Sequence, residues 1–303
     1  MGMRITQQMV TGKALIDLHR QTRRILDLQE ELSTGLKVNS PSDDPLAARR
    51  AINLRSAISK NDQYSINISA IGPQLLETTT AIQTVQSALQ RTRELTLQGA
   101  NGTYTQVQRD QIAIEVNQLL EGMFEQSNHM TNGRYVFGGT RTLTAPFEAT
   151  RNAQGEITSV AYTGNDESVE IQVSDGASVV INESGERAFQ QNQDVFQLLI
   201  DIRDNLRAGN TTALQGDRLT EIKTAQDQLL ISMAHVGATQ NRLDRLVMNL
   251  EDFTDQFKET LSDNIDADYA DTIINLNTQS NAFQAALNAA ARVIQPSLLD
   301  FVR

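Results

Sequence analysis

The chain has 303 residues, of which 39% are hydrophobic and only 5% aromatic, and it contains neither Trp nor Cys. Without cysteine it can form no disulfide, no thiolate nucleophile and no Cys-ligated zinc site. The formal net charge of −11 disfavours nucleic acid and anionic membranes as partners of the whole chain, because both bind basic faces. So few aromatic side chains predict an elongated molecule rather than one large compact core.

Membrane and secretion signals are not visible in the sequence. No run of 18 apolar residues occurs, so we expect no membrane insertion. Residues 1–10 contain no apolar core of a cleavable signal peptide. We therefore expect a chain that either stays in the cytoplasm or is exported by a route that reads no such signal.

A seven-residue repeat predicts a long helix after Asp44-Pro45. Asp44 can cap the free amides of the first turn, and Pro45 suits the first helical position because it has no N–H to leave unpaired. The apolar positions of the repeat are Ile68, Leu75, Ile82 and Leu89. Pro73 is expected to kink this helix or to split it. A companion row three positions later is only half apolar, and it reads Ile71, Thr78, Val85 and Thr92.

The C-terminal half carries the same repeat with no proline between Pro146 and Pro296. It predicts a helix over about 217–263, roughly 70 Å long at ~1.5 Å per residue. Its repeat positions are Ile222, Leu229, Val236, Leu243, Leu250 and Phe257. Together with the four positions of the first repeat, these residues are predicted to form the core of a helical rod.

The two ends of the chain continue the helical pattern, and a further helix is expected at 106–130. Residues 272–291 contain no charged side chain, which is poorly suited to a helix standing alone in water. We therefore expect the ends to be covered by neighbouring subunits and to order and pair only in the assembly. The predicted subunit-interface residues are Leu15, Leu18, Ile25, Leu32, Ile273, Leu276, Phe283, Leu287, Ile294, Leu298 and Leu299.

The middle of the chain changes to a period of two, which indicates strands. Short strands are expected at 160–163, 169–173 and 178–181, separated by Gly- and Asn-containing turns. The predicted fold is therefore mainly α with a β-rich insertion. Long antiparallel coiled-coil-type helices from the two halves form an elongated rod, and a small β domain faces outward.

Five segments follow from this pattern. They are an inner assembly segment (3–42), the first half of the rod (43–134), the β-rich insertion (135–195), the second half of the rod (196–264) and a C-terminal assembly helix (265–303).

Residues that could carry chemistry are scattered. The histidines at 19, 129 and 235 share no ligand spacing, and no nucleophile motif of the G-x-S-x-G type occurs. The glycines between Gly133 and Gly139 are followed by no Lys-Ser/Thr pair, so they form no phosphate-binding loop and are expected to make a turn. The aspartate pairs 43–44 and 266/268 fit helix caps and turns better than a metal site. We expect no enzyme, no cofactor and no metal.

A basic cluster at Arg20, Arg23 and Arg24 lacks interleaved aromatic residues, so a solvated or inter-subunit charged face is expected rather than a nucleic-acid site. The heptads also fit a helical bundle within one chain that has no partner.

Several motifs resemble the bacterial flagellin superfamily. The N-terminal motif is Leu32-Ser33-Thr34-Gly35-Leu36-Lys37-Val38-Asn39-Ser40, followed by Asp43-Asp44-Pro45. The C-terminal motifs are Asn241-Arg242-Leu243, Ile265-Asp266-Ala267-Asp268-Tyr269-Ala270 and Pro296-Ser297-Leu298-Leu299-Asp300-Phe301. Within the superfamily, Arg134-Tyr135-Val136-Phe137-Gly138-Gly139-Thr140 and the residues at 297–301 resemble the members that join the flagellar hook to the filament.

This resemblance implies a structural protein outside the cell, exported through the flagellar type III apparatus without signal cleavage. It implies a ring of subunits at the hook–filament junction that templates filament assembly. The implied partners are further copies of the chain, the adjacent hook-associated protein, flagellin, and an export chaperone on the C-terminal helix.

Three alternatives stay open from the sequence. The chain could be a flagellin that forms the filament itself, or a cytoplasmic coiled-coil scaffold. An enzyme hidden in the insertion is the third, although some 55 residues without clustered His, Cys or paired carboxylates suit a catalytic domain poorly.

Overall fold

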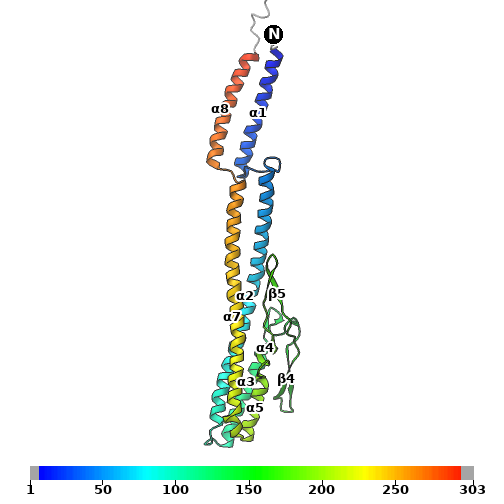
Figure 1. Ribbon diagram of the computed structural model, residues 1–303, viewed down its shortest axis with the longest axis vertical. Helices are drawn as coiled ribbons and strands as arrows, with labels where there is room; N and C mark the ends of the chain where they lie inside the picture. Colours follow the sequence, from blue (N-terminus) through cyan, green and yellow to red (C-terminus); the bar gives the residue numbers. More distant parts are fainter. Residues whose placement is uncertain (1–6, 295–303) are drawn as a thin grey trace, which may run out of the picture. The chain divides into compact units, whose positions relative to one another are not determined.

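The structure is a computed structural model that describes residues 7–294, with side chains given for Met9 and residues 12–291 (Figure 1). Among the described residues, no helix is both long and apolar enough to span a bilayer. The helices are α1 (Gln7–Thr34), α2 (Pro45–Gly99), α3 (Gln106–Ser127), α4 (Gly185–Phe189), α5 (Val195–Ala208), α6 (Thr211–Gln215), α7 (Asp217–Ile265) and α8 (Tyr269–Ile294). The strands are β1 (Met130–Thr131), β2 (Arg134–Tyr135), β3 (Phe147–Arg151), β4 (Ile157–Tyr162), β5 (Glu170–Ser174) and β6 (Ala177–Val180).

The chain divides into two compact units, and both ends of the sequence contribute to the first. Unit 1 consists of residues 1–60 and 253–303, and unit 2 consists of residues 61–252. Helices α2 and α7 each supply residues to both units. The predicted fold class, mainly α with a small β insertion, is confirmed.

The start of α2 forms as the sequence predicted. The Asp44 Oδ1 atom accepts hydrogen bonds from the amides of Leu46 and Ala47, at 2.9 and 3.0 Å. The expectation that Pro73 could split the helix is wrong, because α2 runs unbroken for 55 residues with Pro73 inside it. Both Pro73 and Ser69 are exposed, so the carbonyl left without a partner one turn earlier can bind water instead.

Nine of the ten predicted core positions of α2 and α7 lie inside unit 2. Ile82, Leu89, Ile222 and Leu229 belong to one large cluster that also includes α3 and α5. A second cluster contains Ile68, Leu75, Val236, Leu243 and Leu250 together with Val173 and Val179 from the insertion. The tenth predicted position, Phe257, is only half-buried and lies in unit 1.

The insertion consists of three two-stranded antiparallel hairpins rather than one continuous sheet. The predicted strands correspond to β4, β5 and β6. Strand β3 was not expected, and it pairs with β4 in a register that places Phe147 opposite Tyr162. A cluster of aromatic rings attaches the insertion to the helices. Phe147 lies 5.1 Å from Phe196 of α5, and Phe189 lies 4.9 Å from Phe137, measured between ring centroids.

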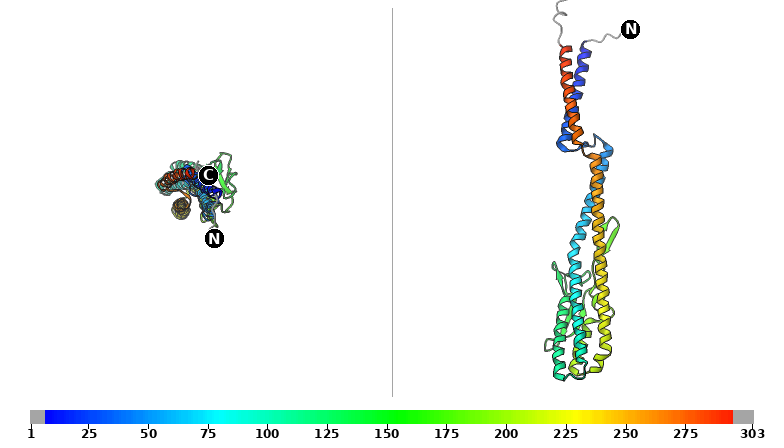
Figure 2. Two further views of the ribbon diagram at one scale, coloured as in Figure 1. Left: turned by 90° about the horizontal axis from the view of Figure 1, so that it is seen from above. Right: turned by 90° about the vertical axis from the view of Figure 1, so that its left-hand side faces the viewer.

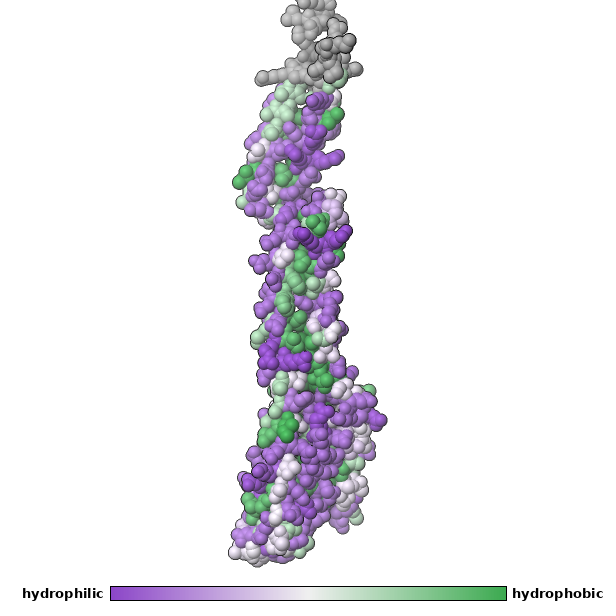
Figure 3. All heavy atoms as spheres, viewed as in Figure 1, coloured by the Kyte–Doolittle hydropathy of each residue, from purple (hydrophilic) through white to green (hydrophobic). Residues whose placement is uncertain are grey.

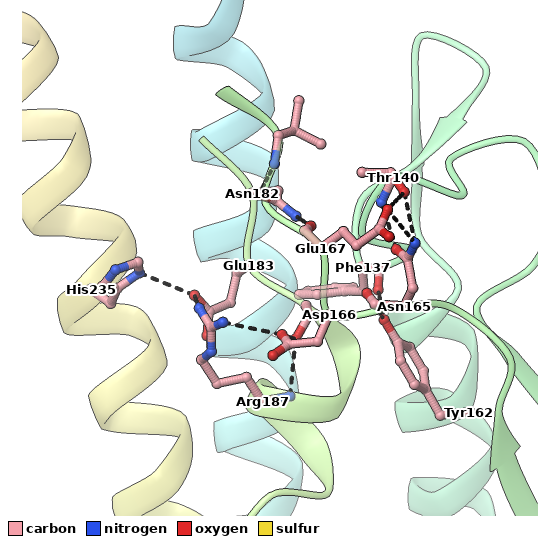
Figure 4. A network of polar contacts seen from close by, with 12 residues as sticks. Phe137, Thr140, Tyr162, Asn165, Asp166, Glu167, Asn182, Glu183, Arg187 and His235 are labelled. Atoms are coloured by element: carbon pink, nitrogen blue, oxygen red, sulfur yellow. Dashed lines mark hydrogen bonds and ion pairs between the residues drawn. The ribbon is translucent and has the colours of Figure 1, made fainter. Parts of the chain in front are cut away.

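A polar network also fastens the insertion to α7 (Figure 4). The Glu183 side chain is fully buried, and its Oε2 atom lies 3.1 Å from Nδ1 of His235 on α7 and 3.8 Å from Arg187. Arg187 also contacts Asp166, at 3.1 Å. Burial raises the pKa of Glu183, although Ser232, Arg187 and His235 all favour its charged form.

We expect the substitution Glu183→Gln to change how stability depends on pH. A raised pKa means that the folded chain holds this proton more tightly than the unfolded chain. The resulting stabilisation is complete below the ordinary glutamate pKa of 4.5 and is lost as pH rises through the raised value. Relative to the Gln variant, the wild type should therefore lose free energy of unfolding as pH rises, as measured by urea titration between pH 4 and 8.

The exposed neighbour Glu186 provides the control, because Glu186→Gln should leave the pH profile of the wild type in place. A difference between the wild type and Glu183→Gln that stays constant with pH would contradict this interpretation.

Candidate assembly interface

Helices α1 and α8 lie side by side in unit 1, as Figures 1 and 2 both show. On each helix the least exposed residues recur at steps of three and four, which is the spacing of a coiled-coil seam. The α1 side of this seam consists of Ala14, Leu18, Gln21, Ile25, Leu28 and Leu32. The α8 side consists of Thr272, Leu276, Gln279, Phe283, Ala286 and Ala290.

The α1–α8 seam is thinly covered in comparison with the core of unit 2. No described side chain of α1 is fully buried, and on α8 only Thr272 and Ala290 are. Small side chains contribute to this, since the alanines at 14, 286, 289 and 290 line an open groove of about 330 Å³ between the helices. A half-buried Leu contributes about half of the ~1.5–3 kcal/mol that full burial provides, so this pair is held weakly.

Several large apolar side chains point away from the seam. They are between 44 and 62% exposed, and they are Met9, Leu15, Ile16 and Leu26 on α1 with Tyr269, Ile273, Ile274 and Leu287 on α8. On the face drawn in Figure 3, small hydrophobic patches alternate with hydrophilic surface along this helix pair. Apolar side chains gathered on two paired helices suit contact with further protein surfaces.

The predicted interface residues therefore separate into three groups. Leu18, Ile25, Leu32, Leu276 and Phe283 lie in the intramolecular seam. Leu15, Ile273 and Leu287 point outward. The side chains of Ile294, Leu298 and Leu299 lie outside the described residues. The expectation that these helices pair only in the assembly is not met, because the structure pairs them within one chain.

Sequence reasoning missed Ile16, Leu26, Tyr269 and Ile274 as outward residues. Each lies out of phase with the heptad of its own helix, so a helical wheel centred on the seam would have identified them.

The loop that follows α1 and the loop that follows α7, where the two helices break, contact each other. The amide of Lys37 donates to the carbonyl of Ile265 at 2.7 Å, and the amide of Ala267 donates to the carbonyl of Gly35 at 2.9 Å. The Lys37 Nζ atom adds a bond to the carbonyl of Asp263 at 2.7 Å. Gly35 has a φ of +74°, and a Cβ at this position would lie 2.9 Å from the hydroxyl of Tyr269. Glycine thus permits both the left-handed turn and the close approach.

The aspartates beside these breaks shape turns and caps, as predicted. The Asp43 carboxylate accepts from the amides of Asn39 and Ser40, at 3.1 and 2.8 Å. The bond from Ser40 is the main reason why the pKa of Asp43 lies below its usual range. Asp268 caps α8 by accepting from the amides of Ala270 and Asp271.

No group of three or more potential metal ligands exists in the described part of the chain. The Nε2 atom of His129 lies 3.1 Å from Glu77, His235 lies beside Glu183, and no described ion pair includes His19. The arrangement is suited to binding other protein surfaces through helix faces.

Two family models match the chain. The bacterial flagellin N-terminal helical region matches residues 5–142, and the bacterial flagellin C-terminal helical region matches residues 219–302. The chain belongs to the bacterial flagellin superfamily. The matched segments include the α1–α8 pair and the loops that meet at Gly35 and Ala267.

Individual relatives are similar over nearly the whole chain. Flagellar hook-associated protein 3 of Escherichia coli is 26% identical over 95% of this chain and 96% of the relative. Flagellin FlaB2 of Treponema pallidum is 27% identical over 90% of this chain and 91% of the relative. Among solved structures, the flagellar junction protein FlgL from Legionella pneumophila has a TM-score of 0.60 at 16% identity, and the match covers 72% of this chain and all of the other. This last likeness shows a shared fold.

We expect Phe283→Asp to separate α1 from α8 in the isolated chain, because a charge placed in the seam would be desolvated without a partner. The free energy that holds α1 against α8 should then fall by roughly 1–3 kcal/mol, and this would raise protease cleavage within both helices about tenfold or more. Limited proteolysis followed by mass spectrometry measures the cleavage rates. The matched control is Leu287→Asp, which places the same charge on the outward side of α8 and should leave cleavage unchanged. Equal cleavage of the two variants would contradict the seam.

Proposed function

We propose that this chain is a structural component of the bacterial flagellum that forms the ring between hook and filament and templates filament assembly. The observation that carries the proposal is the end-to-end similarity to flagellar hook-associated protein 3, which spans 95% of this chain and 96% of that relative. A second protein of the same name, from Salmonella typhimurium, is 25% identical over 94% of this chain and 95% of its own length.

In this proposal the inner assembly segments are residues 3–42 and 265–303. Neighbouring copies cover the apolar side chains that the α1–α8 seam leaves exposed, such as Leu15, Ile273 and Leu287. The uncharged stretch 272–291 supports this, because Asn, Gln and Ala can enter a subunit interface without the cost of burying a charge.

The partners and the location follow from the same role. The ring contacts further copies of the chain, an adjacent hook-associated protein and flagellin, outside the cell. The chain reaches that place without a cleaved signal peptide, and an export chaperone covers the C-terminal helix beforehand. It acts through binding and not through catalysis.

A second candidate function is that of a flagellin, and the 27% identity to a treponemal flagellin over 90% of this chain favours it. Purified chain added to filament seeds distinguishes the two functions, because a flagellin elongates the seeds and a junction protein does not.

The proposed function is tested by deleting the chain from its own organism. We expect electron micrographs of hooks without filaments and flagellin released into the medium, both reversed by the wild-type chain. A deletion strain that keeps its filaments would refute the role.

We expect Leu287→Asp to fold as the wild type does and to fail in assembly. The side chain is 44% exposed in the isolated chain, so the charge is tolerated there but would be desolvated between subunits. Complementation of the deletion strain should leave flagellin in the medium and motility absent. Asn288 is exposed on the same helix, so Asn288→Asp serves as the control that tests whether any added negative charge on α8 has the same effect. Ser280 is partly covered, so Ser280→Asp would not serve this purpose. Normal motility with Leu287→Asp would argue against this surface.

A further inference from the structure

The first turns of α2 carry a basic face. Residues 45–60 contain four basic side chains and no acidic one, so this segment has a formal charge of +4. Arg49, Arg50 and Arg55 are all exposed, and no ion pair of the described residues includes any of them. Ile52 lies among them with 61% of its surface exposed. The three arginines thus combine positive charge that no described ion pair neutralises with a large apolar side chain, Ile52.

The last turns of α7 and the loop that follows carry the opposite charge. Residues 253–268 contain five acidic side chains and one lysine, which gives a formal charge of −4. Asp255, Glu259 and Asp263 are exposed along the helix, and of their carboxylates only that of Asp255 has an ion-pair partner among the described residues, Lys258 at 3.3 Å. Phe253 is exposed at the start of this segment and stacks on Phe257.

These two faces belong to unit 1 and do not neutralise each other within the chain. Among the described residues, no ion pair joins Arg49, Arg50 or Arg55 to an acidic side chain of α7. The buried positions of the two segments are Ala47 and Ala51 on α2 and Thr254 and Ile265 on α7. The charged residues lie at other helical positions and face solvent, so each face is available to another molecule.

We propose that the basic face of α2 in one copy binds the acidic face of α7 in the next copy. This inference rests on the proposed ring, and it specifies which surfaces meet at each boundary between copies. Two different faces that attract each other make a head-to-tail contact, and such contacts close into rings when the rotation permits. The charges orient the copies, while Ile52 and Phe253 supply apolar contact area.

The contact is weak for one pair of copies and gains strength by repetition. An exposed ion pair increases an association constant by about 1.4- to 5-fold, so three pairs give roughly 3- to 100-fold per boundary. Every copy in a ring makes the contact twice, once through each face. Salt weakens such exposed pairs, because a Debye length at physiological ionic strength is only about 8 Å.

The test uses charge reversal in the full chain, expressed in the strain that lacks its own copy. One variant carries Arg49→Glu, Arg50→Glu and Arg55→Glu, and a second carries Asp255→Lys, Glu259→Lys and Asp263→Lys. A third combines all six substitutions, which reverses both faces and restores the net charge of −11. We expect each triple variant to lower the fraction of hooks that bear filaments at least about tenfold, and the sixfold variant to recover most of it.

A matched control carries Arg93→Glu, Lys223→Glu and Arg245→Glu, which change the net charge as much as the first triple variant but lie on exposed positions of unit 2. It should retain filaments. Circular dichroism of each purified variant checks that helicity is unchanged.

Each outcome decides the proposal. Recovery by the sixfold variant supports it when the triple variants keep the helicity of the wild type, because the loss and the recovery then arise from contact between copies and not from the folding of one chain. Filaments retained in either triple variant, loss in the unit 2 control, or no recovery in the sixfold variant would overturn it while leaving the proposed function intact. If the deletion strain itself keeps its filaments, the proposed function fails, and this inference fails with it.

Discussion

An apolar stripe on a helix must be covered by a second apolar surface, and in this chain the covering helix comes from the opposite end of the sequence. Ile68 and Leu75 of α2 share a buried cluster with Val236 and Leu243 of α7. In unit 1 the same rule pairs α1 with α8, which are separated by more than 230 residues. The insertion, the core of unit 2 and the meeting of the two loops at Gly35 and Ala267 all depend on this pairing of distant segments.

The paired helices are buried to different extents in the two units. Unit 2 holds the well-buried core, whereas unit 1 keeps apolar surface that can contact another molecule. In unit 2 the α2–α7 pair is joined by α3, α5 and four phenylalanine rings, so its core positions are sealed from water. In unit 1 the α1–α8 seam is covered along one side of each helix, and large apolar side chains on the outward sides remain exposed. Local stability follows the amount of buried apolar surface, so the ends are the part of the chain that can still gain most from contact with another molecule.

Much of the fold could be predicted because its signals are local and periodic. Asp44 and Pro45 marked the start of α2, and the row from Ile222 to Phe257 predicted a helix over 217–263 that ends within two residues of the end of α7 at Ile265. Pro73 misled the prediction, because a proline on the exposed side of a long packed helix does not end it. Strand β3 was missed because its burial follows from pairing with β4 and from the position of Phe147 against α5, which are contacts between distant residues.

The sequence by itself determined that the chain is mainly helical, that its helices have coiled-coil stripes, and that it carries the end motifs of the flagellin superfamily. These properties follow from the spacing of the apolar residues and from the residue identities of the motifs. Only the tertiary structure decided which apolar residues of the ends are used within the chain and which remain exposed. Leu276 and Leu287 look alike in sequence, yet Leu276 lies in the seam and Leu287 faces outward. Whether a helical side chain is covered or exposed depends on which side of the helix the partner helix packs against. The same holds for Arg49 and Glu259, whose exposure depends on how α2 and α7 pair.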